Sequence, residues 1–246
     1  MSSIMTVLSS MATRKVLGEL ARSYEQRTGH RVKSEAIGGI DAERRVRNGA
    51  AADVVILASK VIEQLEVEGH LVPGCRRNFA SSRIAVAVRS GEARPSIHDE
   101  ERVKQAILGA PRIGYSTGPS GDHLKQLWER WGVASSVSRR AIQAPPGVSV
   151  GALIVQGEVD LGFQQLSELL DVPGIDVLGT LPPDLQGVTV FSMGLSSNSL
   201  SRSQACDLVE YLSSPEADEA KRRNGMEPAQ LRSPAAFAGR VRLSSW

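Results

Sequence analysis

Residues 53–57 read Asp-Val-Val-Ile-Leu, an aspartate followed by a continuous run of four apolar and mostly β-branched side chains. Such a run is typical of a strand buried on both faces of a parallel sheet. Working outward, residues 4–8 form another short apolar run, and residues 31–37 form an extended segment. The stretches between these segments carry apolar residues at helical spacing. The order strand, helix, strand, helix, strand predicts a parallel sheet covered by helices.

The same alternation continues along the rest of the chain. We expect further strands at residues 83–89, 112–116, 140–144 and 160–164, and extended segments at 175–181 and 188–195. Helical spacing recurs between them, most clearly at residues 61–69, 120–131, 149–155 and 203–212. The sequence therefore predicts an α/β protein along most of its length.

Composition excludes several classes of function. The chain of 246 residues carries 29 Lys and Arg against 27 Asp and Glu, a formal net charge of +2. A charge so close to balance gives no bulk attraction for a polyanion, and 4% aromatic residues are too few for a base-stacking platform. We expect no nucleic-acid partner.

Cofactors and metals are not expected either. The four histidines and two cysteines show no metal-ligand spacing, and neither a dinucleotide fingerprint nor a phosphate-binding loop occurs. No apolar run is long enough to insert into a membrane. No secretory signal is visible, which predicts a cytoplasmic protein as written, or a periplasmic one if a signal precedes this sequence.

Four loops that follow predicted strands are small, polar and rich in Gly, Ser or Thr. They span residues 9–13, 38–41, 116–123 and 145–149. Each leads into a predicted helix, whose first N–H groups are free and whose N-terminus carries partial positive charge. Any one loop alone is better explained as an ordinary helix cap. The four together favour a binding site for a small anion at the carboxyl ends of the strands.

Few titratable side chains fall in these loops. His123 and Asp41 are the candidates for a proton-transfer role, because histidine titrates near neutrality and a carboxylate can act as a base. The alternative for each is a helix cap or a solvated surface group.

Several stretches resemble a known family, the molybdate-type periplasmic substrate-binding proteins. They are TVLSSMATRKVLGELARSYEQRTGHRV at 6–32, GGIDAERRVRNGAAADVVILASKVIEQLEVEGHLVPG at 38–74, and GEVDLGFQQLSEL at 157–169. The resemblance implies two α/β lobes joined by crossing strands, with the ligand in the cleft between them. Lobe one would be residues 1–82 and 190–246, and lobe two residues 83–189.

The resemblance also implies which residues hold the ligand. In this sequence they are Ser9, Ser10, Met11, Ala12, Thr13, Gly38, Gly39, Ser116, Thr117, Gly118, Ser120, Gly147, Val148 and Gln165. Serines of the family's first two loops correspond here to Ala12 and the Gly38-Gly39 pair, and a tyrosine of its late strand corresponds to Gln165. A glutamine both donates and accepts hydrogen bonds, which suits an organic acid better than a bare oxyanion.

Two functional hypotheses follow. The first is a cofactor-independent isomerase that shifts the double bond of a small polycarboxylate, because the loops are similar to the aconitate isomerase branch of this scaffold. The second is a solute receptor for molybdate or another small oxyanion, which would have an ABC permease as its partner.

Overall fold

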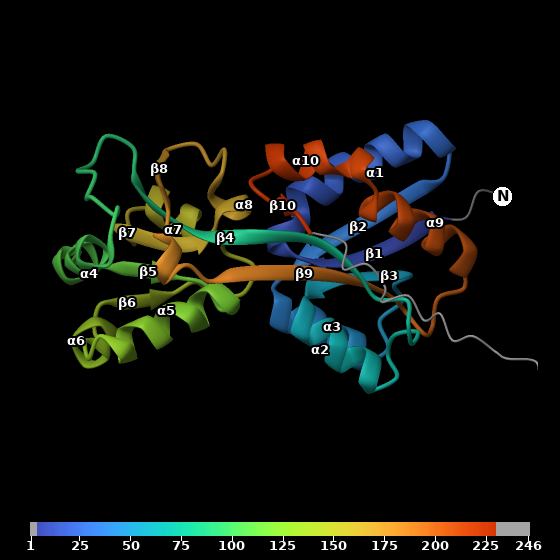
Figure 1. The fold of residues 1–246 in the computed structure, drawn as a ribbon, viewed down its shortest axis with the longest axis horizontal. Helices are drawn as coiled ribbons and strands as arrows, with labels where there is room; N and C mark the ends of the chain where they lie inside the picture. The colour runs from blue at the N-terminus through green and yellow to red at the C-terminus, as the bar shows by residue number, and fades with distance from the viewer. Residues whose placement is uncertain (1–3, 230–246) are drawn as a thin grey trace, which may run out of the picture.

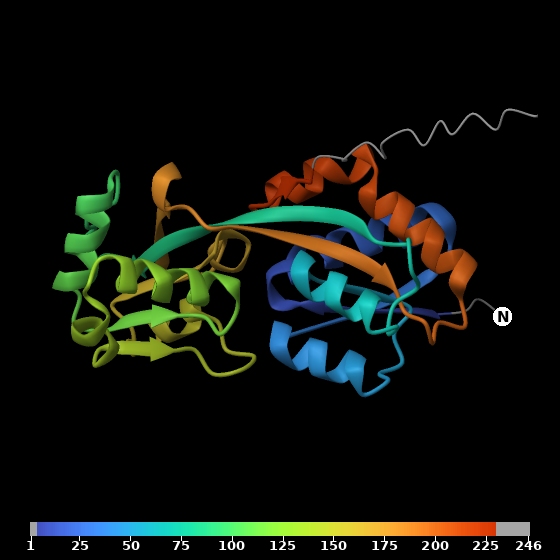
Figure 2. The same cartoon turned by 60° about the horizontal axis from the view of Figure 1, so that its bottom comes forward.

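The structure is a computed structural model that describes residues 4–229 of the chain. It has two lobes, and two strands run side by side between them (Figures 1 and 2). The first part of the chain contains β1 (Ile4–Ser10), η1 (Met11–Thr13), α1 (Arg14–Thr28), β2 (Arg31–Ile37), α2 (Gly39–Arg47), β3 (Val54–Ala58), α3 (Ser59–Val67) and β4 (Arg77–Arg89).

The chain then builds the second lobe and returns to the first. The second lobe contains α4 (Glu100–Gly109), β5 (Ile113–Tyr115), α5 (Pro119–Arg130), α6 (Ala134–Ser138), β6 (Ala141–Gln143), α7 (Val150–Val155), β7 (Leu161–Gln165), α8 (Leu166–Leu169), β8 (Ile175–Thr180) and η2 (Pro183–Leu185). The return consists of β9 (Val188–Leu195), α9 (Arg202–Ser213), η3 (Pro215–Ala217), α10 (Asp218–Arg223) and β10 (Glu227–Pro228).

Strand β4 belongs to both lobes. Its first half pairs antiparallel with β9 at residues 77–83, and its second half pairs with β7 and β8 from Ile84 onward. The strand order is β2-β1-β3-β9-β4-β7-β5-β6. We define lobe one as β1–α3, the first half of β4 and β9–β10. Lobe two consists of the second half of β4 and the elements from α4 to η2.

The predicted α/β architecture with two lobes is confirmed by these elements. The predicted strand at 83–89 was too short, because β4 already begins at Arg77. Residues 77–82 read Arg-Asn-Phe-Ala-Ser-Ser, which shows no clear strand pattern, and they form a strand by pairing with β9. Residues 230–246, which the resemblance assigned to lobe one, lie outside the described part of the chain.

The run at 53–57 forms the centre of lobe one. Val54 and Ile56 pack into the core on one side of the sheet, with α1 and α9, whereas Val55 and Leu57 pack into the core on the other side, with α2 and α3. Figure 1 shows these two helix layers above and below the sheet. The Asp53 carboxylate accepts hydrogen bonds from the Thr6 N–H at 2.8 Å and from the Ser199 hydroxyl at 2.7 Å, so it is paired although buried.

Lobe two repeats this arrangement. Ile84, Val86 and Val88 of β4 pack into a core with α4 and α5, and the alternate residues Ala85 and Ala87 pack into a core with α7. Among residues 4–229, the structure has no helix of the length and apolar character needed to cross a bilayer.

Glycine at position 162 allows α7 to approach the sheet of lobe two. A Cβ atom there would lie 2.6 Å from methyl carbons of both Val150 and Ile154. That contact is too short for real side chains, so only glycine lets the start of α7 sit this close to β7.

We predict that Gly162→Ala lowers the free energy of unfolding by about 1–3 kcal/mol, because it overpacks the core beneath α7. Gly109→Ala is the matched control, since nothing lies within 4 Å of a Cβ at that helical position. Urea unfolding of both variants tests this, and equal stability of the two would contradict the packing argument.

Candidate functional site

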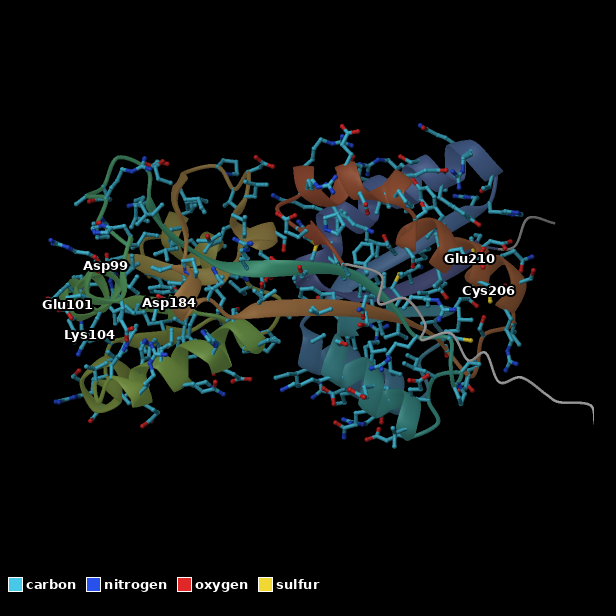
Figure 3. All side chains as sticks on the ribbon, viewed as in Figure 1. Asp99, Glu101, Lys104, Asp184, Cys206 and Glu210 are labelled. Carbon is cyan, nitrogen blue, oxygen red and sulfur yellow. The ribbon has the colours of Figure 1, made fainter. Side chains whose placement is uncertain are left out.

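A cavity of about 260 Å³ lies between the two lobes, and we call it the interlobe cleft. This volume suits a ligand much smaller than a drug-sized molecule. The titratable side chains labelled in Figure 3 lie elsewhere. Asp99, the N-cap of α4, lies with Glu101 and Lys104 of α4 at one end of the molecule, Asp184 is on η2, and Cys206 and Glu210 are on α9 at the other end. Among residues 4–229, no group of three His, Cys, Asp or Glu side chains could hold a metal ion.

The structure brings together most of the residues expected to hold the ligand. All four predicted loops contribute to the lining of the cleft. The expected residues found there are Ser10, Met11, Ala12, Gly38, Gly39, Ser116, Thr117, Gly118, Ser120, Gly147, Val148 and Gln165. The loops meet because parallel strands of both lobes end, and their helices begin, at the same place.

Four expected residues lie outside the lining. Ser9 and Thr13 are fully buried beneath it, and each hydroxyl donates to the Ser10 carbonyl oxygen. The Asp41 carboxylate pairs with Arg44 one helical turn away, at 2.5 Å. The His123 imidazole places Nε2 2.7 Å from the Leu185 carbonyl oxygen, on the η2 segment. In this geometry neither Asp41 nor His123 faces the cleft.

Two buried polar atoms in the lining lack a hydrogen-bond partner among the described residues. They are Ser10 Oγ and Gln165 Oε1, on side chains that are only 7% and 2% exposed. The Gln165 Nε2 atom donates to the Thr189 hydroxyl at 2.8 Å. Because that hydroxyl can donate or accept, the Gln165 amide can present either its oxygen or its NH₂ group to the cleft. Unpaired buried polar atoms are costly, so both side chains are poised for a polar ligand.

Helix starts supply the positive potential of the cleft. Helices α2 and α5, one from each lobe, follow the N-cap residues Gly38 and Gly118, neither of which provides a side-chain cap. The first-turn N–H groups of α2 therefore remain available to an anion. At α5, Pro119 has no N–H and the Gly121 N–H donates to the Gly118 carbonyl oxygen at 2.9 Å, which leaves the Ser120 N–H and the helix dipole. The lining contains no Lys or Arg side chain among the described residues. A bound anion would be held by dipoles and hydroxyls rather than by ion pairs.

The loop after β5 is shaped by Gly121. A Cβ atom at this position would lie 1.9 Å from the Ser116 carbonyl oxygen, so no larger residue fits the turn. The tight turn brings the Ser116 and Ser120 hydroxyls to 2.8 Å from each other at the start of α5. Both hydroxyls line the cleft and can orient toward a ligand.

Glu168 is the functional candidate that the sequence analysis missed. It lies on α8 directly after β7, lines the cleft, and accepts a 2.9 Å hydrogen bond from Gln164 Nε2. Protein atoms surround it on most sides, and this loss of hydration raises the pKa of Glu168 to about 7, although the Gln164 hydrogen bond acts to lower it. A carboxyl group with such a pKa can release and take up a proton at neutral pH.

The other two carboxyl groups of the lining have cationic partners. Glu43 pairs with Arg47 at 2.6 Å, and Asp122 pairs with Lys125 at 2.8 Å. The rule that favoured the four loops, a polar residue after the carboxyl end of a strand, also applies to Glu168. The sequence analysis did not select Glu168, because α8 begins directly after the strand without a loop rich in Gly and Ser.

We predict that Ser10→Ala does not lower stability in the absence of ligand, because the hydroxyl that it removes is unpaired. The matched variant Ser192→Ala removes an equally buried hydroxyl that donates to Asn78 Oδ1 at 2.9 Å, and it should cost about 1–2 kcal/mol. Denaturant unfolding compares them. An equal loss of stability in both variants would show that the Ser10 hydroxyl is paired.

We also predict that Glu168→Gln is more stable than the parent protein above pH 7, by up to about 3 kcal/mol. The folded protein binds the Glu168 proton more tightly than the unfolded chain does, so stability falls as the pH rises from about 4.5 to about 7. Glutamine cannot ionise and avoids this loss. Below pH 4 the two proteins should be equally stable.

Unfolding at pH 4 and pH 8 measures this difference, with Glu158→Gln, an exposed position in the same lobe, as the control. A Glu168→Gln variant that is no more stable than the parent at pH 8 would rule out a desolvated, uncompensated carboxylate.

Comparison with known proteins agrees with the resemblance in the sequence. The model of the family described as bacterial extracellular solute-binding protein matches residues 5–227. The chain is 34% identical over 230 residues to an aconitate isomerase from Pseudomonas sp., covering 91% of this chain and 87% of that protein. It is 20% identical over 225 residues to the molybdate-binding protein of Escherichia coli K12, covering 89% and 87%.

Solved structures share the fold. The periplasmic molybdate-binding protein of Azotobacter vinelandii superposes with a TM-score of 0.77 at 22% identity, covering 92% of this chain and all of that one. The predicted relationship is thus confirmed: the chain belongs to the bacterial extracellular solute-binding proteins.

Proposed function

We propose that this protein binds a small unsaturated polycarboxylate in the interlobe cleft and isomerises its double bond. The relative at 34% identity is an aconitate isomerase, whereas the molybdate-binding relative is 20% identical over a similar length. Aconitate, a tricarboxylate with one double bond, is accordingly the first substrate to test.

The observation that carries the proposal is Glu168, a carboxyl group without a cationic partner in a cleft otherwise built for an anion. Capture of an oxyanion gains nothing from such a group, because its negative form repels the ligand. A double-bond shift needs a group that takes a proton from one carbon and a proton donor for another. A carboxyl group that titrates near neutrality meets this need without a cofactor.

The remaining lining fits the carboxylate groups of such a substrate. The first-turn N–H groups of α2 and the Ser120 N–H of α5 belong to residues that line the cleft from opposite lobes, so they can hold two carboxylates of one molecule. The Ser10 hydroxyl and the Gln165 amide can each donate a further hydrogen bond to a carboxylate of the ligand. The same N–H groups can stabilise negative charge that spreads onto a carboxylate during proton transfer.

A receptor for a small oxyanion is the second candidate. The family and its molybdate-binding members favour it, and so does a cleft that relies on helix starts and hydroxyls. An ABC permease would be the partner of this protein only in that role.

Incubation of the purified protein with trans-aconitate tests the proposal, with the product identified by proton NMR. We expect steady conversion to cis-aconitate without added metal or cofactor. Thermal unfolding with ligand is the parallel measurement, since a ligand at 100 times its Kd stabilises the protein by about 2.7 kcal/mol.

Stabilisation by the aconitates together with turnover would support the isomerase. Stabilisation by molybdate or tungstate, without turnover of any unsaturated di- or tricarboxylate, would contradict it and favour the receptor.

A further inference from the structure

Resting on the proposed function, we propose that Glu168 is the catalytic residue that carries the proton between two carbons of the substrate. We assign Gln164 as the positioning residue that orients the Glu168 carboxyl group. The evidence is a chain of hydrogen bonds that runs from the start of α7 through Gln164 to Glu168.

The Gln164 amide can adopt only one orientation. Its Oε1 atom accepts a 2.8 Å hydrogen bond from the backbone N–H of Val150, and its Nε2 atom donates to Glu168 Oε1 at 2.9 Å. A backbone N–H can only donate, so the amide oxygen must face Val150 and the NH₂ group must face Glu168. The side chain is 3% exposed, which leaves it little freedom to turn.

This arrangement leaves one carboxyl oxygen of Glu168 available. Gln164 holds Oε1, and among residues 4–229 no hydrogen bond reaches Oε2. Because Glu168 lines the cleft, Oε2 is the atom that can take the substrate proton. Holding one oxygen fixes the direction of the other, which is what proton transfer to carbon requires.

The surroundings of Glu168 are uncharged at close range. Helix α8 packs against η1, α7, β4 and β7. Of these elements, η1, α7 and β7 contain no titratable side chain. Charged side chains on the remaining neighbouring segments are Arg77, Arg83 and Arg89 of β4, Lys15, whose ammonium donates to the Leu170 carbonyl oxygen, Asp171, and the paired Glu43 and Asp122 of the lining. Helix α10, whose following residue Gly225 packs against Leu166 of α8, adds Lys221, Arg222 and Arg223.

Burial and one hydrogen bond govern the titration of Glu168. Desolvation raises its pKa to about 7 and the Gln164 hydrogen bond lowers it. Near neutral pH the free protein therefore contains both the ionised and the protonated form, as a residue that accepts a proton and then donates it must.

The proton shift balances without any other reactant. The Glu168 carboxylate takes a proton from the methylene carbon next to the double bond, and the electron pair of that C–H bond becomes delocalised over three carbons and the adjoining carboxylate groups. The protonated Glu168 then delivers the proton to the carbon at the far end of the former double bond. One C–H bond breaks, one forms, the double bond moves by one position, and nothing is oxidised or reduced.

Kinetics of Glu168→Gln with trans-aconitate test the assignment. We expect kcat to fall on the order of 10²–10⁴-fold, the usual contribution of a positioned acid or base, while the variant stays folded. The exposed Glu158→Gln in the same lobe is the matched control and should retain the parent rate. If the parent protein turns over and Glu168→Gln keeps kcat within about fivefold, the assignment of Glu168 is wrong although the proposed function stands.

Gln164→Leu tests the positioning role by a readout that mere loss of structure would not produce. Leucine has a similar size but no donor, so the ionised form of Glu168 loses a hydrogen bond. The acid limb of the kcat/KM profile, which reports the free protein, should move to higher pH, and the rate should recover at alkaline pH. A fall in rate that is equal at every pH would contradict the role of Gln164.

Calorimetry separates this inference from the proposed function. The saturated analogue propane-1,2,3-tricarboxylate, which has no double bond to shift, is titrated at pH 7.5 in phosphate and in Tris, two buffers with different heats of ionisation. The bound anion favours protonated Glu168, so the parent protein should take up protons on binding and Glu168→Gln should take up fewer. Equal proton uptake by both would place the ligand away from Glu168. Absence of turnover by the parent protein would instead overturn the proposed function, and with it the catalytic role.

Discussion

The arrangement of the site depends on the backbone pairing of β4. This strand of thirteen residues exchanges partners between Arg83 and Ile84, from β9 in lobe one to β7 and β8 in lobe two. Because one continuous strand belongs to both sheets, its pairing joins the two lobes directly. The ends of β1 and β2 therefore face those of β5, β6 and β7 across one cleft. Each polar loop alone is an ordinary helix start, and their convergence makes them a binding site.

Local dipoles and hydroxyl groups supply the electrostatics of that site. The net charge of +2 has little bearing on it, since no Lys or Arg side chain of the described residues lines the cleft. The uncapped starts of α2 and α5 provide attraction for an anion at short range, where bulk solvent screens least. In a cleft that lacks cationic side chains among the described residues, no positive side chain offsets the cost of ionising a carboxyl group. Glu168 keeps a proton near neutrality because it is desolvated without a cation to compensate for its charge.

The sequence predicted the fold well, and the four polar loops that it singled out meet at one cleft, because both features follow from local rules. The buried run at 53–57 and the polar loops after the strands depend on side-chain pattern and on the geometry of parallel sheets. The catalytic candidates depend on contacts that no local pattern reveals. His123 was a reasonable base by residue type, but its ring lies against the Leu185 carbonyl oxygen, and Gly187 makes room for that ring.

Asp41 and Glu168 illustrate the same limit. Asp41 lies in a predicted loop, yet its carboxylate forms an ion pair with Arg44 on the next turn of α2. Glu168 has a suitable environment only because Gln164 is oriented by the N–H of Val150, fourteen residues earlier in the chain. That N–H is available there because Gly162 lets α7 approach β7. Sequence reasoning identified each of these segments and could not show that they meet.

A crystal structure of Glu168→Gln with trans-aconitate bound would test the central claim most directly. This account predicts one ligand molecule in the interlobe cleft, with its carboxylates on the N–H groups at the starts of α2 and α5. Its methylene carbon should face the side chain at position 168, on the side away from Gln164. A ligand bound outside the cleft, or one whose methylene carbon is turned away from position 168, would contradict it.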